Sequence, residues 1–117
     1  MRSKLGDKVR VKHILDAIEE IESYIENIDI SDFFNNSMVR FACIKQLEII
    51  GEASNHISED VKSSFAQISW EEIISLRNIL VHEYFGVDAT LVWQIIETDI
   101  PELKTEMEKI IKYVYPQ

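Results

Sequence analysis

The stretch over residues 69–86 places Arg77, Asn78, His82 and Tyr84 among the apolar side chains Ile73, Ile74, Leu76, Ile79, Leu80 and Val81. Because burying polar groups without partners costs free energy, we interpret these four polar side chains as candidates for chemistry. Arginine together with histidine suits cleavage of RNA without a metal. A histidine can move a proton near neutral pH, and a guanidinium can hold the crowded negative charge on a phosphate with two hydrogen bonds.

The stretch itself predicts one helix. Ser69 with Glu72 three residues later is typical of a capping box, and Gly86 favours the left-handed turn that ends a helix. On an ideal helix Tyr84 lies about 20° around the axis from Arg77.

Asn78 and His82 share another face, about 100° to 140° from Arg77. The four side chains therefore span a broad arc. Either a loosened last turn or a second copy related by a two-fold axis could bring them into one cleft.

Each of these residues also has an ordinary structural interpretation: Arg77 as an ion-pair partner, His82 as a hydrogen-bonded helix end, and Tyr84 as the edge of the core. We expect no metal and no cofactor. His82 and Glu83 diverge on a helix, His13 and His56 are remote in the sequence, and no cluster has the spacing of metal ligands.

Composition narrows the class of protein. The chain has 117 residues and a net charge of −9, and 46% of its residues are hydrophobic, which predicts a single helical domain over 1–117. A protein that binds duplex nucleic acid through its overall field would be basic, so we expect any RNA contact to be local. We expect a cytoplasmic protein, because we find no signal sequence or membrane span and the lone Cys43 leaves no internal disulfide.

Apolar residues recur at steps of three and four over residues 7–28 and again over 37–56, which predicts two long helices. Residues 29–36 form a polar break in which Phe33 and Phe34 are expected to anchor the chain to the core. Phe41 is expected on the buried stripe of the second helix. A short helix is expected over 58–64, and a final one after Asp88, interrupted near Asp99 by Pro101. The fold class is therefore all-α, a bundle of four to five helices around a long antiparallel pair.

Gly51 is unusual inside the second long helix, where glycine costs about 1 kcal/mol relative to alanine. Two interpretations stay open. Gly51 could allow close helix packing with Glu52 solvated or paired with an arginine, or Glu52 could orient Arg77 or His82 in a neighbouring helix.

The string Arg77-Asn78-Ile79-Leu80-Val81-His82-Glu83-Tyr84 resembles the signature of the HepT-like branch of the HEPN superfamily. The resemblance extends from Asp7 to Tyr115 and includes Ile49-Ile50-Gly51-Glu52-Ala53, Trp70, Phe85-Gly86-Val87-Asp88 and Trp93.

This resemblance implies a homodimeric helical bundle with the motifs facing each other, and a metal-independent endoribonuclease toxin of a type VII (HEPN/MNT) toxin–antitoxin pair. It assigns catalysis to Arg77 and His82, a supporting role to Asn78, and AMP modification by a minimal nucleotidyltransferase to Tyr84. Two alternatives stay open: a non-catalytic module that binds nucleotide or a nucleotidyltransferase partner, and a purely structural helical dimer.

Overall fold

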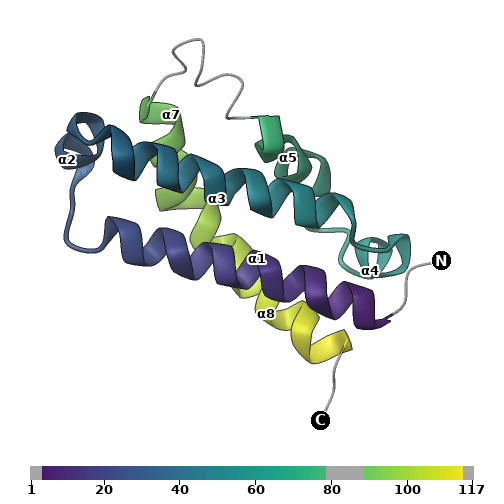
Figure 1. The fold of residues 1–117 in the computed structure, drawn as a ribbon. Helices are drawn as coiled ribbons and strands as arrows, with labels where there is room; N and C mark the ends of the chain where they lie inside the picture. The colour runs from purple at the N-terminus through teal and green to yellow at the C-terminus, as the bar shows by residue number, and fades with distance from the viewer. Residues whose placement is uncertain (1–3, 79–88, 115–117) are drawn as a thin grey trace.

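The computed structural model describes residues 4–78 and 89–114, and all regular structure in these residues is helical, as predicted (Figure 1). Three helices are long, namely α1 (Lys4–Ile25), α3 (Ser37–Asn55) and α8 (Ile100–Val114). The shorter helical segments are α2 (Ile30–Asn35), α4 (Glu59–Ser64), α5 (Trp70–Ile74), the 3-10 turn η1 (Ser75–Asn78), α7 (Ala89–Gln94) and the π turn η2 (Ile95–Asp99). The structure has more segments than the expected four to five helices because α2 lies in the expected polar break and local changes of winding interrupt two of the predicted helices.

The long antiparallel pair is α1 and α3, which lie side by side along the length of the molecule (Figure 1). Their facing stripes are fully buried and consist of Val11, Ile14, Ile18 and Ile21 on α1 with Cys43, Ile44, Leu47 and Ile50 on α3. Helix α8 crosses behind the pair and adds Leu103, Met107 and Ile110 to the same core. Each such side chain stabilises the fold by about 1.5–3 kcal/mol, so this seam determines the architecture.

The link between the long helices differs from the prediction. Helix α1 ends at Ile25 rather than near residue 28, and Asn27 takes a left-handed conformation with φ of 65°, which asparagine tolerates better than most residues. The expected polar break contains the short helix α2, which Asp29 and Asp32 stabilise with a reciprocal capping box. Phe33 is buried 5.0 Å from the Trp93 ring, whereas Phe34 is 42% exposed and does not anchor this segment.

The consecutive segments α7, η2 and α8 form one C-terminal rod. This rod is interrupted near Asp99, as the position of Pro101 predicted. Proline has no N–H to donate to the preceding turn, and the helix widens just before it into η2. Within this turn the Ile100 N–H donates to the Ile95 carbonyl, five residues back. The helix then continues as α8.

Helix α4 begins at a hydrogen-bonded junction with α1. The buried Asp7 carboxylate accepts hydrogen bonds of 2.8 Å from both the Ser58 N–H and the Ser58 hydroxyl, and Ser58 in turn caps α4 at Val61. In the part of the chain that the structure describes, no helix is long and apolar enough to span a membrane.

Candidate functional site

The site is built where α3 meets the turn η1, and Gly51 makes that meeting possible. A Cβ atom at position 51 would lie 2.5 Å from the Arg77 backbone nitrogen and 2.9 Å from the Ile74 carbonyl oxygen. Any side chain larger than hydrogen would force these backbones apart. The expected close packing at Gly51 is therefore confirmed.

The predicted helix over residues 69–86 is not a uniform α-helix in its described part. After five residues the α-helix gives way to the 3-10 turn η1, in the segment that lies against Gly51. Successive side chains advance by about 120° in a 3-10 turn instead of about 100°, so the angles expected for an ideal helix do not apply at Arg77 and Asn78.

The capping box expected at Ser69 is also wrong. Ser69 precedes α5, but its ψ of 73° is not extended and its side chain makes no capping hydrogen bond. The buried Trp70 fixes this corner instead, because its indole N–H donates to the Phe65 carbonyl at 3.1 Å.

The Glu52 carboxylate contacts two side chains here, those of Arg77 and His56. One of its carboxylate oxygens lies 3.7 Å from Nη1 of Arg77, and the other lies 3.0 Å from Nε2 of His56, the residue that caps the C-terminal end of α3. The first alternative considered for this segment is therefore confirmed: the helices pack closely at Gly51, and Glu52 pairs with an arginine, Arg77. That Glu52 orients Arg77 or His82 for function stays a prediction. Arg77 keeps 40% of its side chain exposed, so the guanidinium can still meet a ligand.

A shallow pocket of about 360 Å³ opens around this pair, and it is lined by Lys45, Glu48, Ile49, Glu52, Arg77 and Asn78. Lys45 is held by Glu48 at 2.9 Å on the exposed face of α3. The pocket thus presents a guanidinium and an ammonium, each beside a carboxylate. The two carboxylates balance the two cations, so the pocket has no net charge, and the 40% exposed Arg77 guanidinium is the group that can donate to a phosphate oxygen.

The structure thus brings three predicted site residues together, namely Arg77, Asn78 and Glu52. His82, Tyr84, Gly86 and Asp88 lie outside the described residues, so their predicted roles stay predictions. Sequence reasoning missed His56, which had been set aside as remote. Its spacing of four residues from Glu52 on one helix could have identified the pair.

The described segments contain neither a cluster of metal-ligand side chains nor an activated thiol. Among residues 4–78 and 89–114, no group of three His, Cys, Asp or Glu side chains is placed to hold a metal ion. Burial raises the pKa of the Cys43 thiol to about 12, so this cysteine is a poor nucleophile at neutral pH.

Comparison with known proteins connects this geometry to a family. A family model described as Ribonuclease HepT-like matches residues 14–110. The chain is 42% identical over 106 residues to "Putative RNase MJ1380" of Methanocaldococcus jannaschii, which covers 91% of this chain and 97% of that protein. It is 41% identical over 109 residues to "Probable ribonuclease HepT" of Thermococcus cleftensis, covering 93% and 99% of the two chains. No solved structure matches the chain significantly.

Proposed function

Because this chain belongs to the Ribonuclease HepT-like family, we propose that it is an endoribonuclease whose cleavage centre includes Arg77 and His82. One observation carries the proposal: Arg77 is held by Glu52 in an exposed, cation-bearing pocket on the turn that leads into the family signature. The names of the relatives, an RNase and a ribonuclease HepT, support the same activity.

The proposed reaction requires no metal. The ribose 2′-oxygen attacks the adjacent phosphorus, the bond to the 5′-oxygen breaks, and the products are a 2′,3′-cyclic phosphate and a 5′-hydroxyl. His82 takes the proton from the 2′-hydroxyl or delivers one to the leaving oxygen. Arg77 binds the non-bridging phosphate oxygens and stabilises the charge that accumulates on them, while Asn78 donates a further hydrogen bond.

Glu52 is a positioning residue in this scheme. It restricts the Arg77 side chain from the α3 side and leaves the outer edge of the guanidinium available to phosphate. His56 shares the same carboxylate and limits its rotation.

We further propose that the enzyme acts as a homodimer. Three large apolar side chains on α2 and the first half of α3 are exposed: Met38 at 75%, Phe41 at 48% and Phe34 at 42%. Phe41 was expected in the core, but it lies on the outer side of α3. Met38 and Phe41 share this side with Lys45, Glu48 and Glu52, because these positions recur at steps of three and four.

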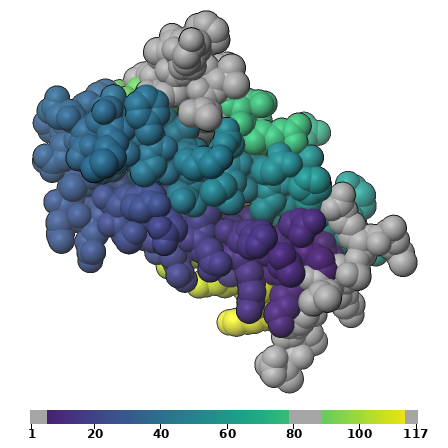
Figure 2. Space-filling view, in the orientation of Figure 1, coloured from purple at the N-terminus to yellow at the C-terminus, as the bar shows by residue number. Residues whose placement is uncertain are grey.

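In Figure 2, α2 and the first turns of α3 form one continuous part of the front surface, and α3 continues from it along the molecule. Exposed apolar patches of this kind mark protein–protein contacts, and a two-fold contact through this patch would bring two copies of the pocket near each other. Sedimentation should give a dimer at micromolar concentration. The double variant Met38→Glu/Phe41→Glu should sediment as a monomer, and a monomeric parent protein would contradict the proposal.

From the resemblance of residues 77–84 to the HepT-like signature, we also propose a role in a toxin–antitoxin pair. The partner would be a minimal nucleotidyltransferase that transfers AMP from ATP to the Tyr84 hydroxyl with release of pyrophosphate. The attached phosphate would pair with Arg77 and exclude the scissile phosphate of RNA. Intact mass after incubation with the enzyme and ATP should increase by AMP units for the parent chain and remain unchanged for Tyr84→Phe. An equal gain in both would place the modification elsewhere.

Cleavage of RNA by the purified chain tests the activity. His82→Ala should slow cleavage by a factor of about 10² to 10⁴, as expected for loss of a general acid–base group. Lys12→Ala serves as the control, because it removes an exposed cation on α1 that does not line the pocket. If His82→Ala cleaves as fast as the parent, the alternative of a non-catalytic binding module takes the place of the nuclease.

A further inference from the structure

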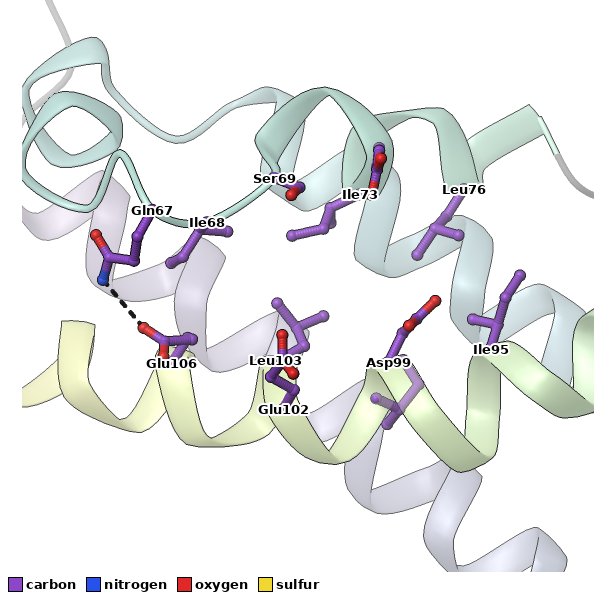
Figure 3. Close-up of a pocket in the computed structure, with 12 residues that line it drawn as sticks. Gln67, Ile68, Ser69, Ile73, Leu76, Ile95, Asp99, Glu102, Leu103 and Glu106 are labelled. Atoms are coloured by element: carbon purple, nitrogen blue, oxygen red, sulfur yellow. Dashed lines mark hydrogen bonds between the residues drawn. The ribbon is translucent and has the colours of Figure 1, made fainter.

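A second concave surface lies on the other side of the α5–η1 segment, between it and the C-terminal rod (Figure 3). This groove has a volume of about 270 Å³. Its apolar lining comes from both walls: Ile68, Ile73 and Leu76 on one, and Ile95, Ile100 and Leu103 on the other. The rim carries four carboxylates, from Glu72, Asp99, Glu102 and Glu106.

Three of the rim carboxylates form a ladder along the rod. Asp99, Glu102 and Glu106 recur at steps of three and four, so they share one face and follow each other at about one per helical turn of 5.4 Å. In Figure 3 the side chains of Asp99 and Glu102 project from the rod towards the opposite wall.

Among the described residues, only one of the four rim carboxylates makes a hydrogen bond or an ion pair. Glu106 accepts hydrogen bonds from Gln67 at 3.2 Å and from Lys109 at 3.3 Å. The carboxylates of Glu72, Asp99 and Glu102 have no hydrogen bond or ion pair with any residue that the structure describes.

The size and charge of the groove together indicate what it accepts. Small-molecule sites typically have volumes of about 300–1,000 Å³, so this groove better suits one or two apolar side chains of a protein. RNA is disfavoured because the carboxylates would repel its phosphates. A cationic partner is favoured, since three carboxylates are available to pair with it.

We propose that this groove docks a basic amphipathic helix of a partner protein. The helix inserts an apolar side chain between the wall of Ile73 and Leu76 and the wall of Leu103. Its Lys or Arg residues, spaced by one turn, pair with Asp99 and Glu102 along the ladder.

The docking proposal does not depend on nuclease activity, although the two sites share one turn. Leu76 lines the groove, and Arg77, the next residue, lines the pocket on α3. A docked helix would therefore contact η1 from the side opposite the proposed RNA site.

A synthetic peptide tests the proposal directly. The probe is a fluorescein-labelled helix of about 15 residues containing leucine and lysine, with leucines on one face. A scrambled peptide of the same composition controls for charge. Fluorescence anisotropy should show tighter binding of the amphipathic peptide to the full chain.

The double variant Asp99→Lys/Glu102→Lys should weaken that binding at least about tenfold. Glu97→Lys/Glu108→Lys is the matched control, because it also reverses two exposed carboxylates on the rod that do not line the groove. It should stay within about threefold of the parent chain, and circular dichroism should show both variants folded. A benzophenone in place of the central leucine should cross-link to residues 68–76 or 95–106.

Equal affinity of the two double variants, equal affinity of the scrambled peptide, or cross-links near the exposed Glu19, Glu20 and Glu22 of α1 would overturn the proposal. The groove would be an RNA site instead if a short RNA displaced the peptide and if Asp99→Lys/Glu102→Lys also altered the affinity for that RNA. Arg77→Ala should leave peptide affinity unchanged, so failure of the docking proposal and failure of the nuclease proposal are distinguishable.

Discussion

Helix α3 meets its neighbours in two different ways. Towards α1 it presents large apolar side chains such as Ile44, Leu47 and Ile50, all fully buried. Towards η1 it presents Gly51 and Glu52, so that backbone lies against backbone and a carboxylate reaches an arginine. The first contact spreads its stabilisation over many side chains, whereas the second depends on one missing Cβ and one exposed ion pair.

The two contacts should therefore have different roles: the α1–α3 seam determines stability, and the η1 contact serves the proposed activity. Changes in the α1–α3 seam should affect folding, because each buried side chain contributes about 1.5–3 kcal/mol. Changes at the η1 contact should mainly affect where Arg77 lies. The following substitutions test that division, beginning with the largest expected effect.

Arg77→Ala should lower the rate of RNA cleavage by a factor of about 10² to 10³, the range seen when a donor to transition-state charge is removed. Stability to urea should change by no more than about 0.5 kcal/mol, because the arginine is 40% exposed and its ion pair is screened by solvent. Lys12→Ala again provides the control. If Arg77→Ala were much less stable than the parent but equally active, the η1 contact would contribute to folding and not to cleavage, which is the opposite of the proposal.

Gly51→Ala should impair both properties. The new methyl group would lie 2.5 Å from the Arg77 backbone nitrogen, so η1 must shift, at a cost of about 1–3 kcal/mol. The better helix propensity of alanine offsets up to about 1 kcal/mol of this. Urea denaturation and cleavage rates, compared where both proteins are folded, provide the measurement. A variant as stable and as active as the parent would mean that the close approach at Gly51 does not position Arg77.

Glu52→Gln should have a modest effect confined to activity. An exposed ion pair contributes up to about 1 kcal/mol, so cleavage should slow by about two- to fivefold while stability stays nearly constant. Glu48→Gln is the matched control, because it lines the same pocket but pairs with Lys45 instead of Arg77. Equal effects of the two substitutions would indicate general pocket charge and no specific positioning by Glu52.

Ser54→Ala should have the smallest effect. The Ser54 hydroxyl is fully buried on α3 and has no hydrogen-bond partner among the described residues. Removing an unsatisfied hydroxyl should leave stability unchanged or raise it by up to about 1 kcal/mol, with no change in cleavage. A loss greater than 1 kcal/mol in thermal or urea unfolding would show that this hydroxyl has a partner.

The sequence predicted the α1–α3 seam well, because helical periodicity reports directly which face is buried. It could not predict the winding of η1, which lies against another helix at Gly51 and is not set by local propensity alone. Phe34 and Phe41 were assigned to the core because residue type alone does not say whether an apolar side chain faces the fold or its surface. Their exposure now carries the argument for a second copy.

Part of the candidate site was also predictable from the sequence. Arg77 and Glu52 stood out because each departs from its local pattern, a cation on an apolar helix and a carboxylate beside a helical glycine. His56 gave no such signal by itself, and only its spacing from Glu52 connects it to the site.

The chemistry of the cleaved RNA ends tests the central claim most directly. The parent chain, incubated with a defined RNA in excess EDTA, should produce 2′,3′-cyclic phosphate and 5′-hydroxyl ends. The same ends should form at a rate lower by a factor of about 10² or more with His82→Ala. Loss of parent activity in EDTA, or 3′-hydroxyl ends with 5′-phosphates, would contradict metal-free cleavage by Arg77 and His82.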